Sequence, residues 1–490
     1  MPLPSYRLAG ADDHTGAVEN ALAAIRAEFD VPDGFPPEVE AEAREAVGRA
    51  QDAAAALPDA TDLPFFTIDP AGSMDLDQAM HLESDGDGHR VRYAIADLGD
   101  VVRPGGAIDT EARRRGQTLY LPDETAPLHP RVLSEDACSL LPGVERAAYV
   151  WDLRLDAAGE LREAHVARQR VRSLARYDYQ RVQALLEGGG EAVDPRTDPQ
   201  LPLLARIGEL RAEAERARGG ASLELPDQEI EKQADGTYLL TYRPLVPAEV
   251  HNAHVSLLTG MAAADMMLAG GVGVLRTMPA PVEKDLDRFR RQASALGIAW
   301  PESMAYGEFL RTLDGANPTH LALVHAATGL FRGAGYTPFD GTPPERSLHS
   351  AIAAPYAHVT APLRRLVDRF GLAVCAALDA GEEVPAWVRE ALPELPEIMG
   401  ESDRKAAAVS RACTNAAEAA ELAHRVGESF EAVVVEDRGE KGLVVQLAEP
   451  AVVGSADGRA ELGARVRVIL REALPQERRV RFEVAGTPRD

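Results

Sequence analysis

The sequence predicts an α+β protein in three parts: a short helical N-terminal segment, a large mixed α/β domain and a small C-terminal β-barrel. Three observations lead to this prediction. The first 56 residues show helical periodicity. Between about residues 101 and 425, strands and helices mix without a regular strand–helix–strand repeat, so a doubly wound sheet is not supported. The last 60 or so residues hold short β-rich runs separated by Gly, Asp and Pro.

The composition is that of a soluble globular protein with an acidic surface. The chain has 490 residues, of which 45% are hydrophobic and 27% charged, and its net charge is −26. This charge argues against a protein that coats nucleic acid non-specifically, but it allows an enzyme with a locally basic channel. Three widely separated cysteines exclude a disulfide scaffold and a clustered-cysteine zinc site. We therefore expect a cytoplasmic monomer with no disulfide-linked partner.

No segment of the sequence is typical of a membrane protein. The longest apolar stretch, residues 257–275, contains Asp265, whose charge would be costly in lipid, so a buried helix is favoured. The N-terminus has no apolar region of the kind found in secretory signals. We expect no membrane contact.

The N-terminal segment, residues 1–56, holds eleven acidic and four basic residues. Apolar spacing predicts one helix over residues 18–29 and a second over 38–55, after the breaker Phe35-Pro36-Pro37. After residue 57 the pattern of the sequence changes from helical spacing to strand-like runs, and three strands are predicted at residues 65–68, 78–82 and 91–95.

Helical patterns dominate the later part of the central domain, residues 57–426. They predict helices at residues 250–268, 286–296, 321–330, 363–378 and 403–426. From residue 427 to 490, runs at 430–435, 442–447, 465–470 and 479–484 predict a closed barrel of about five strands, of OB type. Seven arginines against four glutamates in residues 459–483 fit a solvated β-ribbon and an RNA-binding groove about equally.

The densest chemical signal is the acidic segment TIDPAGSMDLDQAM, residues 67–80. Asp69 ends an apolar strand, and Asp75 and Asp77 follow six and eight residues later. Three carboxylates brought together repel one another unless a hard cation neutralises them. Magnesium or manganese held between carboxylates and substrate phosphate oxygens is a common arrangement for phosphodiester hydrolysis. A solvated acidic turn is the alternative, but the buried strand before the segment and the apolar strand after it favour a metal site.

Two other acidic-motif chemistries fit less well. A haloacid-dehalogenase-type phosphatase has its Asp-x-Asp directly after an apolar strand and followed by Thr, whereas Gly-Ser-Met precedes and Gln follows here. An EF-hand needs a 12-residue loop closed by Glu, which the segment does not supply.

Six ordered segments resemble the motifs of the RNB ribonucleases, the family typified by ribonuclease II and ribonuclease R. TIDPAGSMDLDQA resembles the family hallmark TIDxxxxxDxDDA. The others, in order, are YAIAD (93–97), TLYLP (118–122), LSEDACSL (133–140), YQRVQ (179–183) and HSAIAAPYAHVTAPLRR (349–365). The resemblance covers about residues 57–425. It departs from the family at Gln78, where a fourth aspartate is usual, and at the N-terminus, where the acidic helices replace two cold-shock domains.

The resemblance implies an RNB catalytic domain with an RNA channel. The implied activity is hydrolysis of single-stranded RNA from the 3′ end to nucleoside 5′-monophosphates, with magnesium, or manganese in its place, as cofactor. Asp69, Asp75 and Asp77 would hold the metal, with Gln78 at the fourth ligand position. Arg364 would stabilise the charge that develops on the scissile phosphate.

The same resemblance implies a set of RNA contacts. Tyr120 would stack on terminal bases, Tyr179 would contact ribose and Glu249 would help to select RNA. The remaining candidates for RNA contact are His358, Thr360 and Arg365. Tyr120 as a core aromatic and Tyr179 as helix-start packing are the alternatives. For His358, hydrogen bonding next to the site is favoured over zinc binding, because no third ligand is suitably spaced.

Gln78 keeps a second function open. A chain that has lost one metal ligand but kept the channel would be a catalytically weakened RNA-binding protein of the same fold. The intact Asp69, Asp75, Asp77 and Arg364 favour the enzyme.

Overall fold

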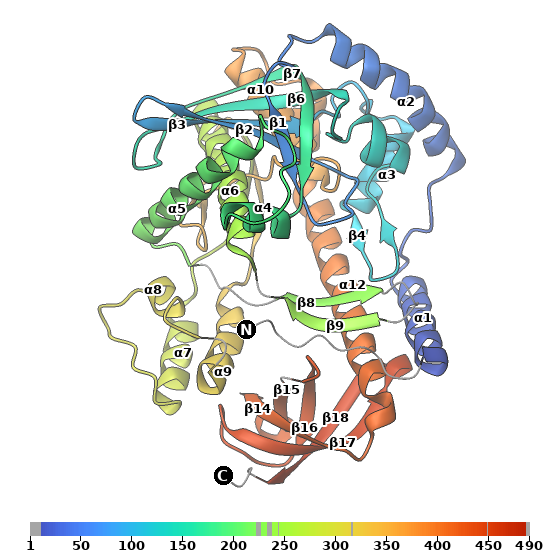
Figure 1. The fold of residues 1–490 in the computed structure, drawn as a ribbon, viewed down its shortest axis with the longest axis vertical. Coiled ribbons are helices and arrows are strands. Elements are labelled where there is room, and N and C mark those ends of the chain that lie inside the picture. Colours follow the sequence, from blue (N-terminus) through green and yellow to red (C-terminus); the bar gives the residue numbers. More distant parts are fainter. Residues whose placement is uncertain are drawn as a thin grey trace.

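Two closed five-stranded β-barrels form the framework of the fold (Figure 1). The computed structural model describes residues 11–221, 227–232, 238–243, 245–314, 317–447 and 449–486. The first barrel has the strand order β1-β2-β3-β6-β7, with β1 antiparallel to β2 and parallel to β7. Its strands are β1 (Phe65–Ile68), β2 (Gln78–Asp85), β3 (Gly88–Ala96), β6 (Glu145–Leu155) and β7 (Leu161–Tyr177).

Helices surround this first barrel, and short strand pairs lie beside these helices or between the two barrels (Figure 1). The helices are α2 (Pro37–Ala56), α3 (Ala107–Arg115), α4 (Tyr179–Leu186), α5 (Leu201–Arg218), α6 (Pro247–Gly270), α10 (Leu366–Asp379) and α11 (Ala386–Ala391). The short strand pairs are β4 (Leu119–Tyr120) with β5 (Thr125–Ala126), β8 (Asp227–Lys232) with β9 (Tyr238–Arg243), β10 (Val272–Thr277) with β11 (Gly335–Asp340), and β12 (Leu348–His349) with β13 (Ala354–Pro355). The main core lies between the barrel and α5, α6 and α10, and includes the fully buried Tyr93 and Trp151.

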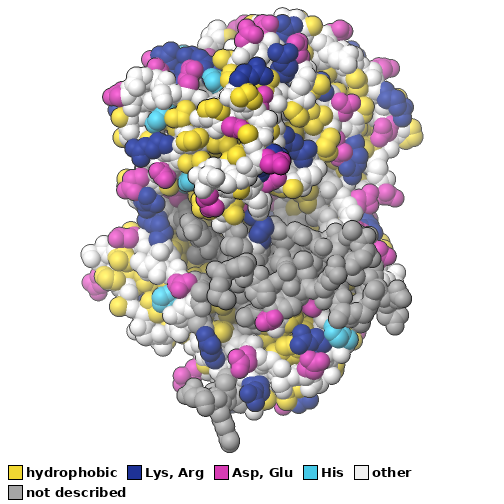
Figure 2. Space-filling view, in the orientation of Figure 1, with side chains coloured by type: hydrophobic (Ala, Val, Ile, Leu, Met, Phe, Trp, Pro, Cys, Tyr) yellow, Lys and Arg dark blue, Asp and Glu magenta, His cyan; other side chains and the backbone are white. Residues whose placement is uncertain are grey.

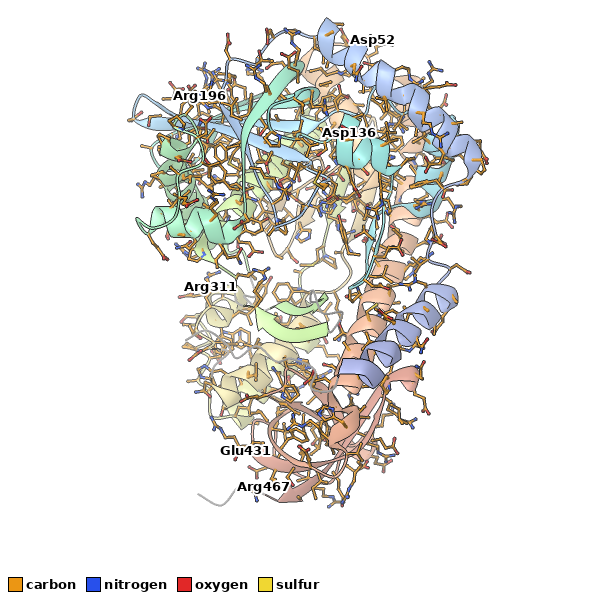
Figure 3. All side chains as sticks on the ribbon, turned by 45° about the vertical axis from the view of Figure 1, so that its right-hand side comes forward. Asp52, Asp136, Arg196, Arg311, Glu431 and Arg467 are labelled. Carbon is orange, nitrogen blue, oxygen red and sulfur yellow. The ribbon has the colours of Figure 1, made fainter. Side chains whose placement is uncertain are left out.

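The second barrel lies at the opposite end of the molecule. Its order is β14-β15-β16-β18-β17, and α12 (Leu395–Leu422) runs toward it from the upper body (Figure 1). The strands are β14 (Ser429–Asp437), β15 (Leu443–Leu447), β16 (Val453–Asp457), β17 (Arg465–Leu474) and β18 (Arg479–Gly486). Helices α7 (Glu283–Ala295), α8 (Tyr306–Leu310) and α9 (Pro318–Ala327) form a small lobe beside this barrel (Figure 1). Helix α1 (Ala11–Glu28) lies along α12 (Figure 3).

The predicted α+β fold is confirmed, including the C-terminal barrel, and β16 is its fifth strand. The three predicted strands correspond to β1, β2 and β3, but the closure of the first barrel by β6 and β7 was not anticipated. The helix predicted from residue 363 begins only at Leu366, so Arg364 and Arg365 lie in the turn before it.

All three cysteines are buried and unbonded. Among the helices of the described residues, none is long and apolar enough to cross a membrane.

Candidate active site

The acidic segment forms a loop between β1 and β2, and the side chain of Ser139 is hydrogen-bonded to the backbone of this loop. Asp69 directly follows β1, and its N–H donates to the carbonyl of Tyr177 on β7 (3.2 Å). The buried Ser139 hydroxyl donates to Met74 O (2.6 Å) and accepts from Leu76 N–H (3.0 Å). Ser139 therefore fixes the loop so that the carboxylates of the segment face one side.

Asp77 is a buried carboxylate with two donors. Its Oδ1 accepts from the backbone N–H of Leu363 (2.7 Å), and its Oδ2 accepts from Nε of Arg364 (3.2 Å). Burial raises the pKa of Asp77 to about 8, while the Arg364 charge and the Leu363 hydrogen bond oppose this rise. Arg364 keeps 46% of its side chain exposed, so its guanidinium can also reach a ligand.

The pKa of Asp69 is also shifted by burial and by neighbouring charges. Burial raises the pKa of Asp69 to about 7; the charge of Arg364 opposes the rise and that of Asp75 adds to it. Its Oδ2 is buried without a hydrogen-bond partner. A buried, unpartnered carboxylate oxygen is the kind of group that a bound cation would satisfy.

These residues meet in one open cavity of about 520 Å³. The exposed ring of Tyr120 forms part of its wall, and the Tyr120 hydroxyl donates to Asp75 Oδ2 (3.1 Å). The lining residues are Ile68, Asp69, Pro70, Ser73, Asp75, Asp77, Gln78, Tyr120, Tyr179, Glu249, Asn252, Ala253, Ser256, Leu257 and Arg364. The structure thus brings together eight of the predicted site residues, from five separate parts of the chain.

Gln78 lines this cavity, but both the nitrogen and the oxygen of its side-chain amide already form hydrogen bonds within the protein. Its Nε2 donates to the carbonyl of Thr360 (2.7 Å), and its Oε1 accepts from the hydroxyl of the buried Tyr93. The side chain therefore links β2 to the turn that carries Arg364, and its carbonyl oxygen already has a donor.

His358, Thr360 and Arg365 are not among the residues that line the cavity. His358 Nδ1 is hydrogen-bonded to the Tyr336 hydroxyl (2.8 Å), and burial lowers the pKa of His358 well below its usual value, which keeps the ring neutral. The buried Thr360 contacts Ser256 Oγ through its hydroxyl (2.9 Å), and Arg365 forms two hydrogen bonds with the buried Asp368. These contacts hold the three side chains within the turn, and the prediction that they contact RNA stays a prediction.

Three polar residues of the cavity were not predicted: Ser73 within the acidic segment, and Asn252 and Ser256 on α6. Asn252 and Ser256 share one face of α6 with Glu249, at spacings of three and four residues. That helical spacing is visible in the sequence and could have identified them.

Glu249 itself is paired with Arg243 at the end of β9 (2.8 Å). Burial, with the charges of Asp69 and Glu249, raises the pKa of Tyr179 to about 12.

The fit to a divalent metal is partial. Within the described ranges, no group of three or more His, Cys, Asp or Glu side chains is arranged to hold a metal ion. Asp69 and Asp75 offer carboxylate oxygens to the cavity, whereas both oxygens of Asp77 have donors. Magnesium is often held by one or two carboxylates together with water and substrate phosphate. The residues present therefore fit one such ion better than a pair of ions clamped by four side chains.

Comparison with known protein families shows which family the chain belongs to. The RNB domain family matches residues 58–371, which is more than half of the chain. The chain belongs to the RNB family. The RNase II-type exonuclease C-terminal S1 domain matches residues 428–485, over the second barrel.

Two curated relatives of this RNB chain are matched over less than half of their length. Ribonuclease R of Vibrio parahaemolyticus is 29% identical over 326 residues, which are 63% of this chain and 38% of the relative. Ribonuclease R of Acidithiobacillus ferrooxidans is 35% identical over 194 residues, which are 39% of this chain and 44% of the relative. The chain thus spans about two fifths of the length of these relatives.

Solved structures share the RNB fold at low sequence identity. Mycoplasma genitalium RNase R in complex with ribose methylated single-stranded RNA superposes with a TM-score of 0.86 at 19% identity, over 96% of this chain and 78% of the other. Yeast Ssd1, described as a pseudonuclease, superposes with a TM-score of 0.68 at 16% identity, over 93% and 58%. The fold therefore occurs both in a nuclease and in a pseudonuclease. The fold alone does not show whether this chain is catalytic, so activity has to be inferred from the residues of the site.

Proposed function

We propose that this chain is a 3′→5′ exoribonuclease that hydrolyses single-stranded RNA to nucleoside 5′-monophosphates. The observation that carries the proposal is the meeting of Asp69, Asp75, Asp77 and Arg364 with the exposed Tyr120 in one cavity. Membership of the RNB family and the likeness to an RNase R solved with single-stranded RNA support it.

The proposed chemistry assigns Asp69 and Asp75 to the metal, which we take to be magnesium, with manganese as an alternative. When bound, the ion would supply the positive charge that activates water and neutralises the phosphate. Asp77 holds Arg364 through Nε, which leaves the rest of the planar guanidinium to bind oxygens of the scissile phosphate. Arg364 would then stabilise the negative charge that develops there.

Other residues of the same cavity would hold the 3′-terminal nucleotides. The exposed ring of Tyr120 offers a surface on which a base can stack. Tyr179, Glu249 and Asn252 lie together along α4 and α6 and present polar groups to the ribose. A carboxylate such as Glu249 can accept a hydrogen bond from a 2′-hydroxyl, which DNA lacks.

The two family matches also support a division of the chain into three parts. We propose an N-terminal helical segment over residues 1–56, a catalytic domain over 57–426 and an RNA-binding barrel over 427–490. The second and third parts begin one residue before the matched regions, which start at residues 58 and 428, while the RNB match itself ends at residue 371.

A degradation assay tests the function. The purified chain is incubated with 5′-labelled single-stranded RNA and magnesium, and with the matching DNA as a control. Progressive shortening from the 3′ end, abolished by EDTA, is expected for RNA only. An intact RNA band that shifts in a native gel, without shortening at any magnesium or manganese concentration, would instead favour the weakened RNA-binding protein.

A further inference from the structure

Helix α1 lies outside the matched RNB region and packs against the hairpin β4–β5, which carries Tyr120. The α1 side chains of Val18, Leu22 and Ile25 are each about 1% exposed. They form one apolar cluster with Leu119 and Leu121 of the hairpin. Residues of α12 complete the cluster: Val409, Ala412, Cys413, Ala416 and Ala420. Figure 3 shows α1 and α12 side by side.

The packing of these two leucines determines which way Tyr120 points. Leu119 and Leu121 are 5% and 9% exposed, whereas Tyr120 between them is 54% exposed. Successive side chains of an extended segment point to opposite sides. Because the leucines are buried on the side of α1 and α12, Tyr120 is directed to the cavity, where its hydroxyl reaches Asp75.

Charged groups connect the end of α1 to the same hairpin and to the second barrel. Arg26 forms an ion pair with Asp123, in the turn between β4 and β5, and this pair is 28% and 14% exposed. Glu28 pairs with Arg478 of the C-terminal barrel (2.6 Å). Just after α1, the carbonyl of Asp30 accepts from Nζ of Lys405 on α12 (2.9 Å). The helix is therefore tied to the hairpin, to α12 and to the barrel at once.

We propose that α1 is a positioning element for Tyr120, acting through the Arg26–Asp123 pair, and that it thereby sets the length of the shortest RNA product. This inference rests on the proposed exoribonuclease function. A base stacked on an aromatic ring gains roughly 5- to 150-fold in affinity. A product of a few nucleotides has few other contacts, so a displaced Tyr120 releases it early. Long RNA retains its contacts elsewhere.

The test compares Arg26→Ala and Asp123→Asn with the unaltered chain. The length of the end product on a sequencing gel should increase by one or more nucleotides in both variants. The KM for a four-nucleotide RNA should rise roughly five- to tenfold, while the initial rate on a long RNA stays within about twofold. The matched control is Arg44→Ala, which removes an arginine from an exposed pair with Glu40 on α2 and should change none of these three quantities. A thermal unfolding measurement verifies that each variant is folded.

Two further variants separate positioning from a general structural effect. The charge exchange of Arg26→Asp with Asp123→Arg should restore the original product length in part. In a Tyr120→Ala background, which should itself release longer products, Arg26→Ala should add almost nothing, because both changes act on the same contact. Unchanged product length in folded Arg26→Ala and Asp123→Asn would overturn the inference, and so would fully additive effects with Tyr120→Ala.

A failure of the proposed function gives a different result. If the unaltered chain does not shorten RNA, the function fails, and the inference is then tested by binding alone. The anisotropy of a labelled four-nucleotide RNA should report weaker binding in Arg26→Ala, with unchanged binding of a long RNA. Equal affinities of both variants and the parent for the short RNA would refute the role of α1.

Discussion

At the scale of single residues, Asp77 combines burial with a fixed arginine partner. Above its pKa of about 8, Asp77 is an anion that pairs with Arg364, and Asp77→Asn keeps the shape and the hydrogen bond from Leu363 but cannot carry that charge. Loss of one preorganised electrostatic group commonly lowers a rate by ~10²–10³. We expect a fall of that size in the hydrolysis rate, with RNA binding retained, because less negative charge then faces the phosphates. Single-turnover rates and Kd values measure both, and more than half of the parent activity would contradict the assignment.

The raised pKa of Asp77 also predicts how stability depends on pH. The folded-state pKa is about 8, against ~3.9 for a free aspartate. Between these values the unfolded chain releases a proton that the folded chain keeps, so Asp77 lowers the free energy of unfolding increasingly as pH rises to about 8. The substitution Asp77→Asn removes the titrating group and with it this effect.

We therefore expect Asp77→Asn to be more stable than the parent in EDTA, by a margin that grows between pH 5 and pH 8.5. Thermal unfolding at several pH values measures the margin. Asp287→Asn, an exposed position on α7, is the control and should shift the unfolding temperature equally at each pH. A margin for Asp77→Asn that does not change with pH would contradict the pKa assignment.

Gln78 gives a prediction about the departure from the family motif. Because its amide joins Tyr93 to Thr360, Gln78→Asp would remove the donor to the Thr360 carbonyl and add a charge beside Asp69 and Asp77. We expect slower hydrolysis and an unchanged or higher magnesium concentration for half-maximal rate. A magnesium titration decides this, with Gln78→Met as the control that removes the amide without adding charge. A lower magnesium requirement in Gln78→Asp would show that the parent site lacks an anionic ligand.

At the scale of elements, a buried ion pair joins α3, just before the Tyr120 hairpin, to α10, just after the Arg364 turn. Arg369 Nη1 donates to Asp109 Oδ1 (2.5 Å), and both side chains are at most 3% exposed. Removing one partner of such a pair typically costs about 3–5 kcal/mol. Asp109→Ala should lower the free energy of unfolding in urea by this amount. Glu394→Ala, at the exposed end of the Arg113 pair, should cost less than about 1 kcal/mol, and equal effects would contradict the argument.

The elements that the sequence predicts best are those with local periodicity. The strands at β1 to β3 and the two N-terminal helices follow from apolar spacing within each segment. The closure of the first barrel does not, because β1 pairs with β7 about a hundred residues later and no local pattern encodes that pairing. The start of α10 was placed three residues early, since the backbone of Arg364 and Arg365 pairs with residues 117 and 118.

The candidate site shows the same division between local and distant information. Asp69, Asp75 and Asp77 stand in one motif, so their proximity follows from the sequence. Arg364 is 287 residues from Asp77, and only the family resemblance placed it in the site. The role of α1 beside the Tyr120 hairpin lay beyond sequence reasoning, because the N-terminal segment has no motif of its own.

At the scale of the whole molecule, a net charge of −26 must be reconciled with the anionic RNA of the proposed function. Acidic and basic side chains are interspersed on the face shown in Figure 2. Because the net charge is negative, the overall electrostatic field repels RNA, so RNA binding depends on local cations in the cavity. A divalent metal is the strongest such cation that the site could add.

This reasoning predicts mutual dependence of metal and RNA binding. The described residues supply only a partial ligand set, so magnesium should bind the chain weakly until RNA phosphate oxygens complete its coordination. Coupling of two ligands is reciprocal, and magnesium should then tighten RNA binding by the same factor, roughly tenfold or more. Anisotropy of a labelled RNA, read at early times before the RNA is shortened, measures this factor from EDTA to millimolar magnesium. Asp69→Asn should abolish the factor because it removes a carboxylate that we assign to the metal, whereas Asp287→Asn should preserve it. RNA affinity that is the same with and without magnesium in the parent would show that the metal does not bridge the chain and its substrate.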